Sequence, residues 1–424
     1  MAKFIRQRGT IDIYEVEALL YNKVLKACQK QASLFHYNPI VTPTFESTAL
    51  FTRSTGETSD IVTKEMYDFK DKGGRDITLR PEGTAGVIRA IVENKLYATN
   101  DLPLRYYYNG SFFRYERAQF GRYREFMQFG VEVVGTNSYL DDVETILLVS
   151  SILKELNITD YKVRINTFGN VECRNAHRDN IKNFIEPHIE NLCEDCKNRF
   201  NKNPLRILDC KVDKEYLEKL TVPVSYDALD DENKETFNKI LNILADNGVT
   251  YEVDKYLVRG LDYYTGLIYE FDITLKDGKT LTVGGGGRYS SLVKELDGPD
   301  LNCVGFGIGV NRLALVLTDL YGLDSFKETV NYYVMPMGEE THQMAVKVAT
   351  ALRNAGHQVV LETNKKSFGS MFKYASRNNF EYAVMIGEEE LKENKVKVKN
   401  LKTQDQYFVS LDKVLGGNIN DELM

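Results

Sequence analysis

The chain has 424 residues, of which 43% are hydrophobic and 27% are charged, and its formal net charge is −7 at pH 7. These values are typical of a folded protein with two or three domains. The negative charge argues against a protein that coats nucleic acid nonspecifically, because that activity needs a basic surface. No apolar run approaches the roughly 18 residues that a membrane span needs, and the amino terminus lacks a signal-peptide pattern. We therefore expect a cytoplasmic protein without membrane attachment.

The first part of the chain contains both helical and extended patterns. Residues 14–32 place apolar side chains at helical spacing, which predicts an amphipathic helix. Residues 39–46 contain two prolines, which favour an extended segment. Residues 76–134 are rich in Tyr, Phe, Ile and Val with alternating polarity, and this predicts antiparallel strands.

The pattern changes twice in the rest of the chain. Residues 172–249 are polar and poor in strand signals, which predicts a mainly helical insertion. Strand patterning resumes at Tyr251 and continues through Gly284–Gly287 to an apolar helix near residues 311–320. Strands and helices then alternate over residues 329–424, which predicts a separate α/β domain. We expect its strands at 330–338, 357–362, 382–387 and 396–401, and its helices at 340–355 and near 371–379.

Six cysteines raise the question of a metal site. Cys193 and Cys196 form a C-x-x-C pair within the predicted insertion. Further potential ligands lie nearby in the sequence: Cys173, His177, His188 and Cys210. A zinc site is one interpretation of this segment. Because a structural zinc site usually has two tight ligand pairs and only one is present, we expect reduced thiols and no bound metal.

A predicted hairpin over residues 105–135 has the strongest functional pattern. Side chains alternate along a strand, so one face is apolar and the other polar. The polar face is expected to contain Arg114, Glu116, Phe126, Gln128 and Glu132. The connecting loop adds Arg117, Arg122 and Arg124, which would repel one another unless they face anions. A half-solvated sheet is the alternative, but a bound polyphosphate, with Phe126 stacked on a base, explains the arginines better.

This segment resembles motif 2 of the class II aminoacyl-tRNA synthetases, in the form of the histidyl family. Other stretches agree with the resemblance: RGTIDI at 8–13, LRPEGT at 79–84, CEDCKNRFNKNPLRILDCK at 193–211, LVRGLDYYTG at 257–266, GGGRY at 285–289 and GFGIGVNRL at 305–313. The resemblance covers essentially the whole chain. The sequence departs from the family's usual pattern at Ala118, Met127, Ser290 and Asn311, the last of which replaces an acidic residue.

The resemblance implies an α+β fold. Residues 1–325 would form a catalytic domain built on an antiparallel sheet flanked by helices, with the insertion at 172–249. Residues 329–424 would form the anticodon-binding α/β domain. Pro43 and Glu46 resemble motif 1, which builds the dimer interface in this class, so the resemblance also implies a homodimer.

The resemblance further implies ATP-dependent activation of L-histidine, followed by transfer to the 3′ end of tRNA(His). Arg259 and Arg114 would be the catalytic cations at the α-phosphate. The ATP-binding residues would be Arg114, Glu116, Arg122, Phe126 and Arg312. Mg²⁺ would accompany ATP, and no tightly bound cofactor is expected. Histidine would be held by Glu82, Thr84, Arg114, Gln128, Glu132, Arg259, Tyr263, Tyr264 and Tyr289.

Several alternatives remain open at this stage. Arg259 could be a structural arginine paired with Asp262 or Glu270, and the tyrosines could be ordinary core residues, since the chain has 26 of them. The chain could also be a histidine-binding regulatory paralogue without catalysis, or a stand-alone RNA-binding protein. The paralogue typically lacks the anticodon domain and has eroded arginine motifs, whereas this chain retains Arg114, Arg122, Arg259 and Arg312. The RNA-binding alternative leaves the polar sheet face unexplained. We therefore expect the enzyme.

Overall fold

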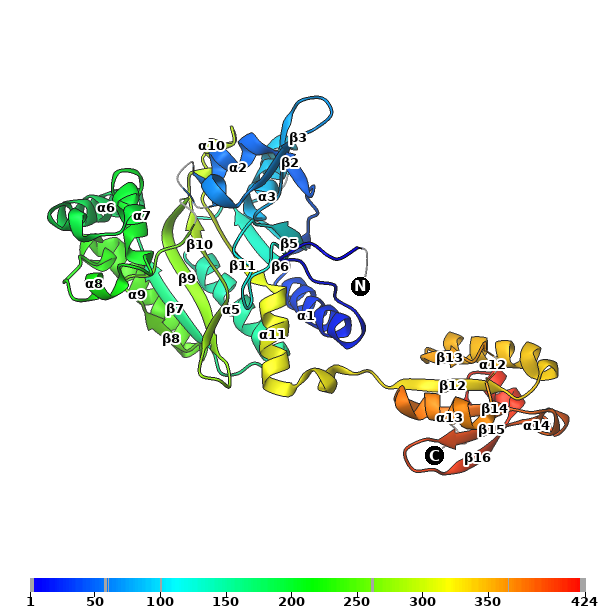
Figure 1. Cartoon of the computed structure of the whole chain (residues 1–424). Helices are drawn as coiled ribbons and strands as arrows, with labels where there is room; N and C mark the ends of the chain where they lie inside the picture. Colours follow the sequence, from blue (N-terminus) through cyan, green and yellow to red (C-terminus); the bar gives the residue numbers. More distant parts are fainter. Residues whose placement is uncertain are drawn as a thin grey trace. The chain divides into compact units, whose positions relative to one another are not determined.

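The computed structural model describes residues 4–56, 59, 61–99, 101–260, 263–364 and 366–419. The chain forms two compact units, Met1–Ser325 and Phe326–Met424 (Figure 1). Within the described ranges, no helix is long and apolar enough to cross a membrane.

The first unit is built on an eight-stranded sheet with the order β1-β5-β6-β11-β10-β9-β7-β8. Its strands are β1 (Asn38–Pro39), β5 (Leu104–Phe113), β6 (Glu125–Val134), β7 (Lys162–Thr167), β8 (Tyr251–Val253), β9 (Tyr264–Thr274), β10 (Thr280–Tyr289) and β11 (Cys303–Gly309). The six inner strands pair antiparallel, and only the outer pairs β1–β5 and β7–β8 are parallel. A smaller sheet contains β2 (Phe45–Ser47), β4 (Asp76–Leu79) and β3 (Tyr67–Lys70). The predicted α+β class with an antiparallel sheet is confirmed.

Helices accompany this sheet, and α5 and α11 contact its strands directly. The longer ones are α1 (Glu15–Leu34), α3 (Thr84–Glu93), α5 (Leu140–Glu155) and α11 (Val310–Tyr321), and the shorter ones are α2 (Thr48–Thr55), α4 (Leu96–Thr99) and α10 (Leu292–Glu295). The chain also forms a π-helical turn, η1 (Ile61–Glu65), and a 3-10 turn, η5 (Leu323–Phe326), which spans the sequence boundary between the two units. Helix α1 contacts both α5 and α11. It buries Leu20, Val24 and Cys28, which lie at helical spacing as predicted.

The prediction of strands throughout residues 76–134 is wrong in part. Only β4, β5 and β6 are strands, and α3 and α4 lie between β4 and β5. Helix α3 is rich in β-branched residues, which favour strands by propensity. However, Val87, Ile88 and Ile91 lie at helical spacing and are all buried in the core. Tertiary packing of that face outweighs the local preference.

The insertion is helical, as its polar composition predicted. It contains α6 (Val171–Ile185), α7 (Glu194–Lys202), α8 (Lys214–Glu218) and α9 (Asp231–Asp246). Three 3-10 turns connect them: η2 (Glu186–Asn191), η3 (Pro204–Asp209) and η4 (Ser225–Ala228). Figure 1 shows these helices gathered at the end of the sheet that contains β7 and β8.

The second unit has a five-stranded sheet with the order β13-β12-β14-β15-β16. Its strands are β12 (Val330–Pro336), β13 (Val359–Leu361), β14 (Phe380–Ile386), β15 (Lys395–Asn400) and β16 (Gln406–Ser410). Its helices are α12 (His342–Asn354), α13 (Phe368–Arg377), α14 (Glu388–Lys392) and α15 (Leu411–Leu415), after the 3-10 turn η6 (Glu339–Thr341). Tyr332 and Val334 join one core cluster and Tyr333 and Met335 another, so both sheet faces are covered and β12 is apolar without alternation. The sequence did not predict β16, α14 or α15.

Candidate active site

The β5–β6 hairpin forms the floor of the site. Strand β5 ends at Phe113, one residue before Arg114, although the sequence placed Arg114 and Glu116 within the strand. The Arg114 backbone N–H still donates to the Arg124 carbonyl at 2.9 Å. The Arg114 side chain donates from Nε to the Pro81 carbonyl at 2.8 Å. The arginine is therefore fixed at the strand end by two neighbouring segments.

A buried carboxylate, Glu132, lies on β6 and pairs with Tyr106 of β5. Glu132 accepts hydrogen bonds from Thr84 Oγ1 at 2.7 Å and from Tyr289 OH at 2.6 Å. Burial raises the pKa of Glu132 to about 8, and the two hydroxyl donors only partly oppose this shift. A cationic amino group placed beside it would stabilise the ionised form. The pocket is therefore suited to an ammonium ligand.

Glu82 lies beside this pocket but already has a local role. Its carboxylate accepts from the backbone N–H groups of Thr84 at 2.7 Å and Ala85 at 2.9 Å, at the start of α3. Burial raises the pKa of Glu82 despite these bonds. The carboxylate thus stabilises the amino-terminal end of the helix whose first residue, Thr84, orients Glu132.

Three predicted tyrosines form an aromatic wall. The ring centroids of Tyr263 and Tyr264 lie 4.8 Å apart, and those of Tyr263 and Tyr289 lie 5.2 Å apart. Tyr108 is a fourth buried tyrosine, and its hydroxyl accepts from Gln128 Nε2 at 3.4 Å. Tyr108 was not among the residues predicted from the sequence. The feature that could have indicated Tyr108 is Gly130, which pairs with it across the hairpin. Because Gly130 has no Cβ atom, it leaves room for the Tyr108 ring.

Arg259 pairs with Glu270, one of the two partners foreseen in the structural alternative. Arg259 Nη1 donates to Glu270 Oε1, and the two side chains are 19% and 18% exposed. Asp262, the other candidate partner, lies outside the described residues. Burial alone would lower the pKa of Arg259, but the Glu270 charge outweighs it, so the guanidinium stays charged. Arg259 Nε is buried without a hydrogen-bond partner among the described residues.

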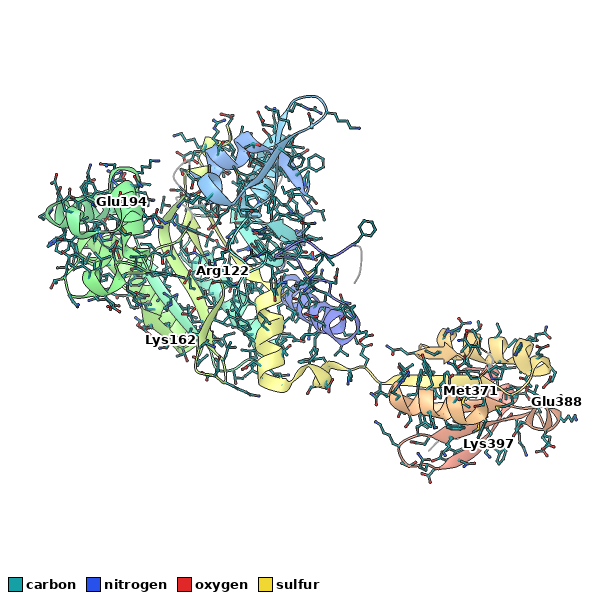
Figure 2. All side chains as sticks on the ribbon, in the orientation of Figure 1. Arg122, Lys162, Glu194, Met371, Glu388 and Lys397 are labelled. Carbon is teal, nitrogen blue, oxygen red and sulfur yellow. The ribbon has the colours of Figure 1, made fainter. Side chains whose placement is uncertain are left out.

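The remaining cations surround Glu116. Its carboxylate lies 3.0 Å from Arg122 Nη1 and 3.8 Å from Arg114 Nη1. Arg312 donates to the Gly121 carbonyl at 3.1 Å and to the Thr282 carbonyl at 2.7 Å. Burial, followed by the charge of Arg122, lowers the pKa of Arg312. Figure 2 shows Arg122 in the middle of this unit. Like charges crowded in this way favour binding of a multivalent anion.

Comparison with known proteins decides the family. A family model described as Histidyl-tRNA synthetase matches residues 9–313, and one described as Anticodon binding domain matches residues 331–417. The histidine–tRNA ligase of Lactobacillus delbrueckii subsp. bulgaricus is 46% identical over 95% of this chain and 95% of its own length. The chain belongs to the histidyl-tRNA synthetase family. The resemblance inferred from the sequence is therefore confirmed.

Other relatives of the family agree over nearly the full length. The histidine–tRNA ligase of Bacillus licheniformis is 41% identical over 96% of both chains. A crystal structure of the apo histidyl-tRNA synthetase of S. aureus covers 97% of this chain and 98% of its own, with a TM-score of 0.83 and 33% identity. The class II fold, with its carboxy-terminal domain, is thus confirmed.

The family's glycine-rich strands make room for the charged side chains. A Cβ atom at Gly307 would lie 2.3 Å from Gln128 Nε2, and one at Gly305 would lie 2.1 Å from Glu132 Oε2. On β10, a Cβ atom at Gly285 would lie 2.7 Å from Arg259 Nη1. Gly285 therefore makes room for a cation of the protein itself.

Asn311, which departs from the family pattern, anchors the helix that contains Arg312. Its Oδ1 accepts from the Met127 backbone N–H at 2.6 Å, and its Nδ2 donates to Tyr21 OH at 3.0 Å. An amide can do both, whereas an ionised carboxylate only accepts. The buried Asn311 therefore ties α11 to β6 and α1.

The loop arginines behave differently from one another. The Arg124 guanidinium lies 3.9 Å from the centre of the Tyr115 ring, and Arg122 pairs with Glu116. Arg117 is exposed. Protein groups therefore account for two of the three arginines, and the sequence argument that all three need an anion was too strong.

Proposed function

We propose that this chain activates L-histidine with ATP and transfers the histidyl group to tRNA(His), the histidine–tRNA ligase reaction predicted from its sequence. The observation that carries the proposal is the buried Glu132 pocket next to a cluster of four arginines: Arg114, Arg122, Arg259 and Arg312. One part suits an amino acid's ammonium group and the other suits a polyphosphate. Relatives 40–46% identical over nearly the whole chain are named histidine–tRNA ligases.

In the first step, the histidine carboxylate attacks the α-phosphate of ATP, the new bond forms histidyl-adenylate and pyrophosphate leaves. The carboxylate is already ionised at pH 7, so this step needs no general base. It needs alignment and positive charge at the phosphates. Arg114 and Arg259 approach the α-phosphate from two sides, and Arg122 and Arg312 hold the outer phosphates. We propose that Mg²⁺ enters with ATP.

Glu116 and Phe126 complete the nucleotide site in this proposal. The Arg114 guanidinium lies 5.4 Å from the centre of the Phe126 ring, so the ring is close enough to share a ligand with that arginine. Glu116 keeps Arg122 and Arg114 near each other. Binding of ATP would redistribute this ion pairing, with Glu116 turning toward the adenine.

The histidine pocket follows from the buried polar groups. Glu132 binds the ammonium group, with Thr84, Gln128 and Glu82 around it, and Tyr263, Tyr264 and Tyr289 line the imidazole. Such a pocket rejects an isostere that lacks the ring N–H, because its own polar groups would be left unpaired.

In the second step, the 3′-hydroxyl of tRNA attacks the activated carbonyl, its proton passes to a phosphate oxygen of the adenylate, and AMP leaves. The second unit offers a basic strand for the tRNA. Lys395, Lys397 and Lys399 alternate with the buried Val396 and Val398 on β15. Lys397 and Lys399 also lie over aromatic rings, at 5.8 Å from Phe408 and 5.3 Å from Phe372. Basic and aromatic side chains together suit single-stranded RNA.

A homodimer in the cytoplasm is part of the same proposal. Val41 is 91% exposed and Phe45 is 58% exposed, next to the motif 1 residues Pro43 and Glu46. Large apolar side chains exposed together support an interface there. Light scattering of the purified chain tests it, and a monomer at micromolar concentration would contradict it.

The test of the reaction is histidine-dependent exchange of labelled pyrophosphate into ATP. We expect exchange with histidine and not with other amino acids, and loss of exchange in Arg259→Ala. Arg117→Ala is the matched control, because Arg117 is exposed and the assay contains no tRNA. Histidine binding without any exchange would contradict the proposed catalysis and favour the regulatory paralogue.

A further inference from the structure

Four potential metal ligands meet in the insertion, far from the arginine cluster in sequence. Cys193 and Cys196 lie at the start of α7, and Cys210 and Asp213 follow η3. One ligand atom of each lies within 4.8 Å of all the others. Three of the four residues are buried, and Cys193 is partly exposed. All three cysteines are free thiols.

Two of the distances between ligand atoms match a tetrahedral zinc site, and the remaining ones stay within 4.8 Å. With Zn–S bonds of about 2.3 Å and a Zn–O bond of about 2.0 Å, two sulfurs lie about 3.8 Å apart and a sulfur lies about 3.5 Å from the oxygen. The Sγ atoms of Cys193 and Cys210 are 3.7 Å apart. Cys210 Sγ is 3.5 Å from Asp213 Oδ2.

Backbone groups are already arranged around these ligands. The Asp213 backbone N–H points at Cys210 Sγ at 3.4 Å. The Cys193 backbone N–H lies 3.1 Å from both carboxylate oxygens of Asp213. Such hydrogen bonds orient the ligands of metal sites. Among the residues that the structure describes, no lysine, arginine or histidine forms an ion pair with the buried Asp213. A divalent cation would supply the missing positive charge.

Only one ligand pair was predicted from the sequence, because the prediction rested on cysteine and histidine alone. The second pair is Cys210-x-x-Asp213, with the same spacing as Cys193-x-x-Cys196. The other nearby candidates lie elsewhere. Cys173 Sγ faces Asp230 Oδ2 at 3.5 Å, and His188 Nδ1 bonds Tyr216 OH at 3.1 Å. His177 stacks near Phe168 instead.

We propose that Cys193, Cys196, Cys210 and Asp213 bind one zinc ion in a closed structural site. Three thiolates favour zinc over hard cations such as Mg²⁺ and Ca²⁺. Four protein ligands leave no open position for a substrate, which is the mark of a structural site.

The site joins α7 to η3, and η3 contacts the loop that contains Arg259. Arg206 Nη1 donates to the Gly260 carbonyl at 3.3 Å. Leu205 and Arg206 line a small cavity together with Val258 and Arg259. Zinc bound next to η3 would therefore restrain the segment that packs against the Arg259 loop. This structural restraint does not depend on the proposed reaction.

Metal analysis of the full-length chain, purified without chelators or a histidine tag, tests the site. We expect about one zinc per chain in the wild type, and loss of that zinc in Cys196→Ser and Asp213→Ala. Cys173→Ser is the matched control and should retain the metal, because Cys173 is a buried cysteine of the same insertion outside the cluster. Zinc lost equally from the control would overturn the assignment.

Cobalt reconstitution of the wild type keeps the test valid if the variants fail to fold. After chelation and addition of one equivalent of Co²⁺, we expect thiolate-to-cobalt charge transfer and the strong visible bands of tetrahedral coordination. A wild-type chain that is folded and reduced but holds neither zinc nor tetrahedral cobalt would overturn the proposal. A disulfide between Cys193 and Cys210 in the chain as purified under reducing conditions would also overturn it.

Hydrogen exchange tests whether the metal restrains the loop that contains Arg259. Removal of the metal should increase amide exchange in residues 203–209 and 256–260, and zinc should restore the protection. The backbone of the second unit serves as the internal control. Unchanged exchange in residues 256–260 would contradict the coupling of the metal to the Arg259 loop.

Discussion

Removal of the Glu270 charge tests whether the Arg259 ion pair supports catalysis. Glu270 lies on β9 between Gly285 and Arg164 on the neighbouring strands. One carboxylate oxygen accepts from Arg259 and the other from Arg164 Nη2 at 2.5 Å. In Glu270→Gln, Arg164 keeps Asp272 at 2.6 Å and Asp254 at 3.0 Å. Arg259 loses the one carboxylate partner that it has among the described residues.

The size of the effect follows from the type of bond. A hydrogen bond to a charged group contributes about 1.5–3 kcal/mol. Because 1.36 kcal/mol corresponds to a tenfold change in rate, the loss predicts a kcat for pyrophosphate exchange about 10- to 150-fold lower. The pair is partly exposed, which places the effect toward the lower end of this range. We expect the KM for ATP to change little, since Arg122 and Arg312 remain in place.

Steady-state exchange assays of Glu270→Gln and Asp272→Asn distinguish the explanations. Asp272→Asn is the matched control, because it removes a partner of Arg164 but none of Arg259. It should keep nearly the wild-type kcat. A positioning role of Glu270 for Arg259 would be refuted if Glu270→Gln kept its kcat and bound ATP more tightly. That result would mean that Glu270 competes with the phosphates for Arg259 instead of positioning it.

Three further outcomes follow from the geometry and the pKa shifts. Burial raises the pKa of Glu132 to about 8, so this carboxyl is mostly protonated at pH 7 in the free chain. Binding of the histidine ammonium should therefore release close to one proton. Calorimetry in buffers of different ionisation enthalpy measures this release, and we expect none in Glu132→Gln. Gly307→Ala should displace Gln128 and raise the KM for histidine about tenfold, which corresponds to a loss of about 1.4 kcal/mol in binding free energy. Gly369→Ala on α13, where a Cβ atom would meet open space, is the control and should leave the KM unchanged. Burial lowers the pKa of His177 to about 4, so the unfolded chain binds the proton first as the pH falls below about 6.5, and stability should decrease by about 2 kcal/mol between pH 7 and pH 5. Thermal melts of His177→Leu should show a smaller shift over that interval.

Each of these three predictions has an outcome that would contradict it. An equal proton release in Glu132→Gln would place the titrating group elsewhere. A Gly307→Ala chain with normal KM would show that Gln128 does not contact histidine. If His177→Leu lost as much stability as the wild type between pH 7 and pH 5, the acid sensitivity would come from other groups.

Much of the molecule could be predicted from local patterns. Helical spacing located α1 and α11, the polar segment was helical, and alternating strands and helices marked the second unit. The motifs named the family because the residues that define it are close in sequence. Local patterns failed where propensity and packing disagree, as in α3, whose Val and Ile side chains resemble a strand but are buried as a helix.

Strand register and packing between distant segments decided the rest. Tyr108 is placed against Glu132's strand by its partner Gly130, and Arg259 fits beside Glu270 because Gly285 has no Cβ atom there. Asp213 can be recognised as a potential metal ligand only in the structure, because the chain folds back after η3 and brings its carboxylate close to Cys193. A sequence pattern reports the spacing of residues along one element. The distances between elements depend on how side chains fill the core, and these distances determine which charges, rings and thiols meet.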